Sequence, residues 1–267
     1  MAEIPKISIV TPSYNQGSFL GDAIRSVVSQ NYPRLEYIVV DGGSTDESVR
    51  VIKEYEEHID AWVTETDRGQ THAIRKGLKT ATGDLYGWLC ADDLLLPGAL
   101  QVVGEHCPMN GWLIGAAEVA DVGEAPHAVI RHEGYRPGDV LCGSYILNQV
   151  SVFWSRALYE DVRGLEESLD YAMDWDLWTQ FERVRTPEIV SRPLGRFRLH
   201  PAQKTASQEP YWNELLDRRA HIRRKNWGYF LRGWLSWQLR ELFDHIGVGP
   251  SVGPNIQSLS SRSAHTE

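Results

Sequence analysis

The sequence predicts an α/β fold in which a mostly parallel central sheet is flanked by helices. Over residues 1–90, strand-like apolar runs alternate with helix-like stripes, a pattern typical of parallel strands joined by crossover helices. Two of these runs end in carboxylates: Tyr37–Val40 leads into Asp41, and Leu85–Leu89 leads toward Asp92 and Asp93. Open α/β sheets bind ligands beyond the carboxyl ends of their strands, so we expect the functional site there.

The expected elements follow from residue type and spacing. Short β-branched or apolar runs predict strands, and apolar residues recurring every three or four positions predict helices. In chain order these are a strand at Lys6–Val10, a helix at Ser18–Gln30, a strand at Leu35–Val40, a helix opened by a capping box at Ser44–Glu47, a strand at Ala61–Thr64, a helix at Thr71–Ala81 and a strand at Leu85–Leu89. Beyond Asp93 we expect a helix at Pro97–Glu105, a possible hairpin of strands Trp112–Val119 and Ala128–His132, and helices at Ser155–Val162 and Asp174–Val184.

The carboxyl-terminal part of the chain differs in composition from residues 1–205, which we predict to be the main domain. Residues 206–247 are predicted to be a helical extension rich in Trp and Arg; Pro210–Phe243 holds four of the ten tryptophans. Two interpretations stay open: an interfacial surface that meets anionic lipid headgroups, or packing against the main domain or against a second subunit of a homodimer. Residues 248–267 are rich in Gly, Ser and Pro and are predicted to be disordered.

Composition excludes several classes of protein. The net charge of −9 argues against a nucleic-acid binder, which needs basic residues to neutralise phosphates. Cys90, Cys107 and Cys142 lie far apart and form no C-x-x-C, so neither a disulfide framework nor a zinc site is indicated, and a reducing compartment fits. No signal peptide and no apolar run of ~20 residues is visible, so we expect a cytoplasmic protein.

Seven short motifs occur in the order and spacing of glycosyltransferase family 2, which the chain resembles over residues 1–205. They are T-P-S-Y-N at 11–15, V-D-G-G-S-T-D at 40–46, D-R-G-Q at 67–70, T-G-D at 82–84, A-D-D at 91–93, M-D-W-D-L-W at 173–178 and R-L-H-P-A-Q-K-T at 198–205. The resemblance implies a Rossmann-like GT-A fold. It also implies inverting transfer of a sugar from a nucleoside-diphosphate donor to a hydroxyl of a glycan or lipid-linked acceptor, as in bacterial surface polysaccharide synthesis at the inner face of the membrane.

The resemblance also assigns the residues of a nucleotide site. Tyr14 offers a flat face on which a nucleobase could stack, although a core aromatic is the alternative. Asp41 could accept hydrogen bonds from a base edge or ribose, and the following glycines let a ligand approach the backbone. The predicted nucleotide-binding residues are Pro12, Tyr14, Asn15, Asp41, Asp67 and Asp92.

A divalent metal is expected beside this site, because the charge that grows on a departing nucleoside diphosphate must be neutralised. By resemblance, Asp93 and His200 would hold Mg²⁺ or Mn²⁺, Asp92 would contact the ribose or the metal shell, and Arg196 and Arg198 could pair with phosphate oxygens. The alternative for the two aspartates is a helix N-cap before Leu94. Ala91 stands where many relatives carry an acidic or polar residue.

Asp174 is the candidate catalytic base, since inverting transfer needs a carboxylate to take the proton of the attacking hydroxyl. Relatives commonly read E-D here, whereas this chain has Met173 before the aspartate, so Asp176 and Asp170 are competing candidates. Alternatives to a glycosyltransferase are a catalytically silent nucleotide-sugar-binding or scaffold subunit and a sugar-phosphate nucleotidyltransferase. A nucleotidyltransferase needs a Gly-rich loop with a basic residue after the first strand, whereas this chain has S-Y-N-Q-G there. The sequence also lacks a G-x-G-x-x-G motif, which argues against a dinucleotide-dependent oxidoreductase.

Overall fold

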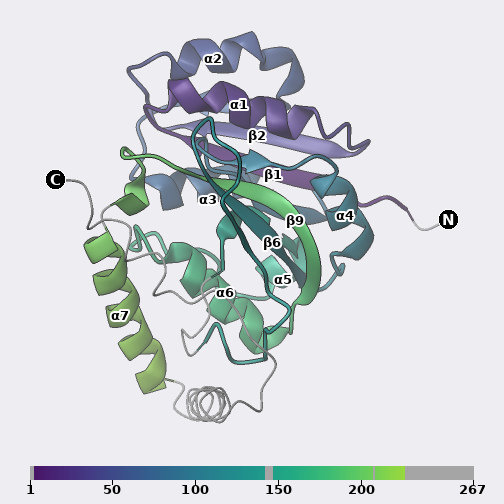
Figure 1. Ribbon diagram of the computed structural model, residues 1–267, viewed down its shortest axis with the longest axis vertical. Helices are drawn as coiled ribbons and strands as arrows, with labels where there is room; N and C mark the ends of the chain where they lie inside the picture. The colour runs from purple at the N-terminus through teal and green to yellow at the C-terminus, as the bar shows by residue number, and fades with distance from the viewer. Residues whose placement is uncertain (1–2, 142–146, 207, 226–267) are drawn as a thin grey trace.

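The computed structural model describes residues 3–141, 147–206 and 208–225, and within them the chain builds one mixed sheet with helices on both faces (Figure 1). The strand order is β3-β2-β1-β4-β8-β6-β9-β5, and β7 pairs with β6 outside that path. Four parallel strands from the first half of the chain make one side of the sheet: β1 (Ile7–Ser13), β2 (Leu35–Asp41), β3 (Ala61–Thr64) and β4 (Leu85–Trp88). The predicted α/β class is therefore confirmed.

The helices of the first half alternate with these strands as the sequence predicts. They are α1 (Gly17–Val28), α2 (Ser48–Glu54) and α3 (Gln70–Thr80), and a 3-10 turn, η1 (Glu56–His58), precedes β3. The predicted capping box at Ser44–Glu47 is wrong. The Ser44 hydroxyl donates to Asp41. Helix α2 begins four residues later, at Ser48, whose amide donates to the Asp46 carboxylate.

The second half of the chain extends the sheet. The hairpin of β6 (Trp112–Asp121) and β7 (Ala128–Ile130) is antiparallel as predicted, and the predicted helices are α4 (Ala99–His106), α5 (Arg156–Glu160) and α6 (Met173–Val184). Three strands were not expected: β5 (Leu94–Leu95), β8 (Val152–Ser155) and the long β9 (Glu188–Leu199). Because Leu94 starts a strand, the alternative that Asp92 and Asp93 cap a helix is wrong.

Two apolar cores lie on opposite faces of the sheet. One is built with α1, α2 and α4, and the other with α3 and α6; Figure 1 shows α1 and α2 above the sheet and α3 and α6 below it. In the second core the ring of Trp178, on α6, stacks against Trp88 of β4 at 5.4 Å between centroids and against Trp112 of β6 at 6.1 Å. Trp154 and Phe181 complete this tryptophan cluster, which fixes α6 to the sheet.

The described part of the carboxyl-terminal block is helix α7 (Gln208–Lys225), which lies beside α6 (Figure 1). Leu215 is only 2% exposed, and Trp212 packs against the apolar core built with α3 and α6 (the α6-face core), so this part of α7 packs internally. Trp227, Trp234, Trp237, Cys142 and the predicted disordered tail 248–267 lie outside the described residues. Among the helices that the structure describes, none is both long and apolar enough to cross a bilayer.

Candidate active site

The candidate site lies where β1, β2, β3 and β4 end, because the polar motifs follow these parallel strands. The loops after β1 and β2 are tied together: the Asn15 amide donates to Ser44 Oγ at 2.8 Å, and Asn15 Oδ1 accepts from the Thr45 amide at 2.8 Å. Asn15 holds a positive φ of 51°, which Asn tolerates better than most residues. These contacts bring the T-P-S-Y-N and D-G-G-S-T-D motifs side by side.

Tyr14 is 61% exposed at this edge, so the alternative of a core aromatic is wrong. Pro12 is buried in β1, in register with Val40. Asp41 is fully buried and accepts hydrogen bonds from the amides of Gly43 and Ser44, at 3.1 and 2.9 Å, and from the hydroxyls of Ser44 and Thr64. In this structure the Asp41 carboxylate therefore organises the loop on which a ligand would rest.

Asp67 closes the same edge from the loop after β3. Its Oδ1 accepts from the Gly69 amide at 2.8 Å, and its carboxylate lies against Gly42. A Cβ on Gly42 would lie 2.7 Å from Asp67 Oδ2, so a larger residue at position 42 would displace the Asp67 carboxylate. The structure thus brings all the predicted nucleotide-binding residues of β1, β2 and β3 to one end of the sheet.

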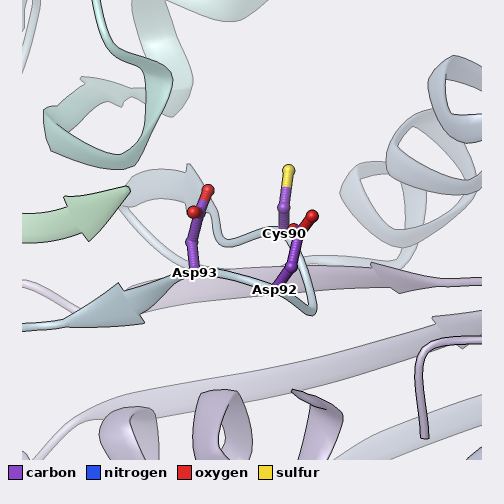
Figure 2. A group of neighbouring side chains, drawn as sticks. All are labelled: Cys90, Asp92 and Asp93. Atoms are coloured by element: carbon purple, nitrogen blue, oxygen red, sulfur yellow. The ribbon is translucent and has the colours of Figure 1, made fainter. Parts of the chain in front are cut away.

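The loop between β4 and β5 presents three side chains to one side of the backbone: Cys90, Asp92 and Asp93 (Figure 2). One potential ligand atom from each lies within 4.8 Å of the others. Asp93 is 2% exposed; its Oδ1 accepts from the Arg198 amide at 3.1 Å, and its Oδ2 accepts from Gln149 Nε2 at 3.1 Å. Burial raises the pKa of Asp93 well above its usual range, and the charge of Asp92 raises it further.

His200 follows β9 and reaches the same loop. Its Nε2 lies 3.1 Å from Asp92 Oδ2, and Nδ1, which is buried, has no hydrogen-bond partner among the described residues. In the structure His200 therefore contacts Asp92, whereas the sequence predicts that His200 and Asp93 bind one metal ion together. Its ring packs against Phe19 at 4.4 Å between centroids.

The arginines that flank His200 are engaged by protein groups. Arg196 pairs with Glu118 at 2.7 Å, and Arg198, 4% exposed, pairs with Asp22 at 3.1 Å and donates to the Asp92 carbonyl. Arg198 therefore anchors β9 to α1 and to the acidic loop. The expectation that either arginine contacts phosphate has no support in these contacts.

Asp174 lies in the first turn of α6, where its Oδ1 accepts a hydrogen bond of 2.6 Å from the Trp175 amide. The side chain is half-buried, and burial raises its pKa to about 6. Burial raises the pKa of the Cys90 thiol, and the charges of Asp93, Asp92 and, to a smaller extent, Asp174 raise it further. The tryptophan cluster brings α6 next to this loop, since Trp178 of α6 stacks on Trp88, two residues before Cys90.

The competing candidates for the base are placed differently. Asp176 is 1% exposed and is enclosed by Arg163 Nη2 at 2.9 Å and Arg218 Nε at 2.7 Å, which leaves it no access to a substrate. The Asp170 backbone carbonyl accepts from Lys204, which also reaches Gln70 Oε1 at 3.4 Å. The two arginines therefore argue against Asp176, and Asp174 and Asp170 are the remaining candidates.

Sequence reasoning missed Cys90, Gln149 and Lys204 at the site. Cys90 stands next to the A-D-D motif, so its position could have been noticed. Gln149 comes from η2 (Gln149–Ser151) and Lys204 from η3 (Lys204–Ala206), both distant in sequence from the acidic loop. Lys204 belongs to the R-L-H-P-A-Q-K-T motif, whereas nothing local in the sequence marks Gln149.

A mixed sheet with an acidic loop at the carboxyl ends of its parallel strands is the arrangement of the GT-A fold, and the comparisons agree with this fold. Residues 8–107 match the model of glycosyl transferase family 2. The matched stretch runs from β1 to the end of α4 and is similar to glycosyltransferase family 2.

The relatives that cover most of the chain are distant in sequence. An uncharacterised glycosyltransferase of Rickettsia prowazekii is 25% identical over 211 residues, which are 75% of this chain and 66% of that protein. Staphylococcus aureus TarS 1-349 in complex with UDP-GlcNAc is 17% identical with a TM-score of 0.65, over 86% of this chain and 73% of that one. The mannosyltransferase PcManGT of Pyrobaculum calidifontis, in complex with GDP-Man and Mn²⁺, is 18% identical with a TM-score of 0.62, over 98% and 81%. At these identities the two structures support the fold.

Proposed function

We propose that this protein is an inverting, metal-dependent glycosyltransferase that moves a sugar from a nucleoside diphosphate to an acceptor hydroxyl. The observation that carries the proposal is a chain of contacts between the acidic loop and the turn that leads into Asp174. Gln70 Nε2 donates to Cys90 Sγ at 3.1 Å, and Lys204 Nζ donates both to Gln70 Oε1 at 3.4 Å and to the Asp170 carbonyl. A carboxylate with a pKa of about 6 on one side, and an acidic loop suited to a diphosphate–metal complex on the other, are the two parts that such a reaction requires.

In the proposed reaction the acceptor oxygen attacks the anomeric carbon while Asp174 takes its proton. The bond from the anomeric carbon to the diphosphate oxygen breaks, and its electron pair leaves with the nucleoside diphosphate. Attack from the side opposite the leaving group inverts the configuration. Tyr14 would stack on the nucleobase, while Pro12, Asn15, Asp41 and Asp67 would shape the pocket for base and ribose.

The residues of the acidic loop fit a divalent cation. Three donor atoms lie within 4.8 Å of one another, burial and the charge of Asp92 raise the pKa of Asp93, and the buried Nδ1 of His200 has no hydrogen-bond partner among the described residues. We propose that Asp93 holds Mg²⁺ or Mn²⁺, with Asp92, His200 or Cys90 as further ligands. A bound cation would supply Lewis-acid stabilisation of the leaving diphosphate.

The comparison structures bound to UDP-GlcNAc and GDP-Man suggest which donors to test first. We propose to screen UDP-, GDP-, dTDP- and CDP-sugars by thermal shift with Mn²⁺, and then to measure release of the nucleoside diphosphate with candidate acceptors. Asp93→Asn should abolish turnover and the Mn²⁺-dependent part of the shift, whereas Asp121→Asn, an exposed carboxylate at the end of β6, should change neither.

Three outcomes would contradict this function. Full activity of the wild type in excess EDTA would remove the metal from the mechanism. Binding of a nucleotide sugar without any turnover across the acceptor panel would favour a silent nucleotide-sugar-binding or scaffold subunit. Formation of a nucleotide sugar from a sugar phosphate would instead indicate a nucleotidyltransferase.

We further propose a glycan or lipid-linked acceptor and a role in surface polysaccharide synthesis at the inner face of the membrane. Leu215 and Trp212 of α7 pack internally, so we place the proposed contact with anionic lipid in the chain beyond residue 225. Sedimentation with anionic liposomes at low salt tests this contact. Loss of sedimentation on deletion of residues 226–267 would support it, and no sedimentation of the wild type would retire it.

A further inference from the structure

Helix α7 contacts the helix that carries the proposed base at its amino-terminal end. The Glu214 carboxylate accepts hydrogen bonds from three consecutive backbone amides: Asp170 at 3.1 Å, Tyr171 at 3.0 Å and Ala172 at 2.9 Å. These amides form the turn that leads into α6, and α6 begins at Met173. Ala172 occupies the N-cap position and has no side chain that could cap the helix, so Glu214 supplies the acceptor from another helix.

A second contact lies one helical turn further along α7. Arg218 Nε donates to Asp176 Oδ1 at 2.7 Å, and Asp176 is 1% exposed. Glu214 and Arg218 are four residues apart and thus share one face of α7. Their contacts lie on either side of Asp174 in sequence: Glu214 binds the amides of residues 170–172, just before α6, and Arg218 binds Asp176 within α6.

The charges of the two contacts match the local fields. A carboxylate at the start of a helix meets the positive end of the helix dipole, and an arginine pairs with a buried carboxylate. Leu215, buried between them on the chain, and Trp212 add apolar contact with the α6-face core. The same turn is held from a second direction by Lys204, whose Nζ contacts the Asp170 carbonyl and lies over the Tyr171 ring at 4.9 Å.

The Asp174 side chain depends on this turn for its position. Its Oδ1 accepts a hydrogen bond from the Trp175 amide in the first turn of α6. The carboxylate therefore moves with the backbone of the first turn of α6. A shift of about 1 Å in a reacting group can cost about a hundredfold in rate.

We propose that α7 positions the catalytic base, with Glu214 as the principal positioning residue and Arg218 as its support. This inference rests on the proposed function of Asp174 and adds a role for the carboxyl-terminal block that the family domain at residues 8–107 does not contain. Glu214 touches no predicted donor-binding residue, so it should affect the rate of transfer and leave donor binding unchanged.

The test is Glu214→Gln in the full chain, with Asp217→Asn as the matched control. Asp217 lies on the same helix and is exposed, so the control removes the same charge from α7 without touching α6. Glu214→Gln keeps one acceptor oxygen but loses the negative charge that binds the three amides. We expect kcat to fall about tenfold to a hundredfold, with the donor KM and the nucleotide Kd within about twofold of the wild type. The control should match the wild type.

Amide hydrogen exchange supplies a readout that does not depend on turnover. Peptides covering residues 170–176 should exchange faster in Glu214→Gln, whereas peptides of β1 and β2 should not change. Glu214→Ala removes both acceptor oxygens and should move kcat and exchange further in the same direction. If that variant does not fold, Glu214→Gln alone carries the test.

The outcomes separate this inference from the proposed function. If Asp174→Asn is inactive but Glu214→Gln has a normal kcat, the result supports Asp174 as the base and refutes the positioning role of Glu214. If exchange rises without loss of kcat, Glu214 is only structural and the inference is wrong. Loss of donor affinity in step with kcat, or an equal loss in Asp217→Asn, would also overturn it. A fully active Asp174→Asn would refute the base itself, and the positioning role with it.

Discussion

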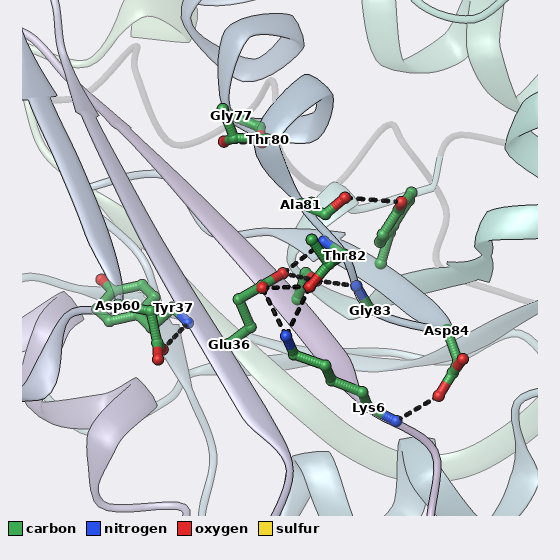
Figure 3. Close-up of polar contacts among 12 residues, drawn as sticks. Lys6, Glu36, Tyr37, Asp60, Gly77, Thr80, Ala81, Thr82, Gly83 and Asp84 are labelled. Atoms are coloured by element: carbon green, nitrogen blue, oxygen red, sulfur yellow. Dashed lines mark hydrogen bonds and ion pairs between the residues drawn. The ribbon is translucent and has the colours of Figure 1, made fainter.

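Glu36 ties together the amino ends of the three central strands, opposite the site, and its replacement tests how the sheet is held. Its Oε1 accepts from Lys6 Nζ and Thr82 Oγ1, both at 2.6 Å, and its Oε2 accepts from Ser8 Oγ at 2.5 Å and the Thr82 amide at 2.7 Å (Figure 3). These partners belong to β1, its lead-in and the loop before β4. The side chain is 12% exposed.

The four contacts lower the pKa of Glu36 from 4.5 to about 2, in spite of burial, which acts in the opposite direction as the largest single effect. A difference of about 2.5 pH units corresponds to about 3 kcal/mol of folding free energy at ~1.4 kcal/mol per unit. Lys6 is 32% exposed, and solvent screening reduces the share of that pair, so we expect about 2–3 kcal/mol.

We therefore expect Glu36→Gln to lower the free energy of unfolding by about 2–3 kcal/mol near neutral pH. Because the folded pKa lies below the unfolded value, this stabilisation is complete above pH 4.5 and is lost as the pH falls toward about 2. Urea unfolding of both proteins at about pH 7 and about pH 3 measures the difference. Glu54→Gln is the control, since its exposed pair with Arg50 should contribute only about 0.3–0.5 kcal/mol.

The reasoning about Glu36 would be refuted by an equal loss at both pH values, which would mean that packing, and not charge, makes the contribution. A loss no larger than that of Glu54→Gln would show that the four contacts contribute little in solution.

Four further predictions concern the site. Asp174→Asn should lower turnover by about 10²–10⁴-fold with donor affinity within about twofold, and an unchanged rate would place the base elsewhere. Asp176→Asn should instead lower the melting temperature, since it leaves two arginines without their buried carboxylate; a normal melting temperature with lost turnover would exchange the two roles. With Mn²⁺ saturating, log kcat should fall with decreasing pH below about pH 6, because Asp174 must be deprotonated to accept a proton, and a rate that stays flat down to about pH 5 would contradict this assignment. Tyr14→Ala should weaken nucleotide binding by about 1–3 kcal/mol if the exposed ring stacks on the base, and calorimetry showing an unchanged Kd would remove it from the site.

The parallel half of the fold was predictable because its signals are local. Each of β1 to β4 is a short apolar run, and each helix between them carries its own apolar stripe. The acidic loop was predictable for the same reason, since Asp92 and Asp93 directly follow a buried strand. The tie of His200 to Asp92 depends on a contact 108 residues apart, so sequence spacing alone could not specify which aspartate it meets.

The strand β9 was missed because its sequence contains turn signals. Pro193 and Gly195 interrupt the run, and the pairing of β9 with β6 shifts register at these residues, between Gly115 and Ala117. A bulge accommodates the proline that would otherwise break the ladder. The capping box at Ser44 failed because Asp41, three residues earlier, takes the serine hydroxyl for the loop.

The tryptophan cluster gives this protein an intrinsic optical signal for the seating of α6. The rings of Trp88 and Trp178 are inclined by 10° and those of Trp112 and Trp178 by 13°. Indoles stacked this closely couple their electronic transitions, and the resulting circular dichroism depends on distance and angle. A displacement of the helix that carries Asp174 would therefore be visible in the near-ultraviolet spectrum of the unlabelled protein, before any substrate is known.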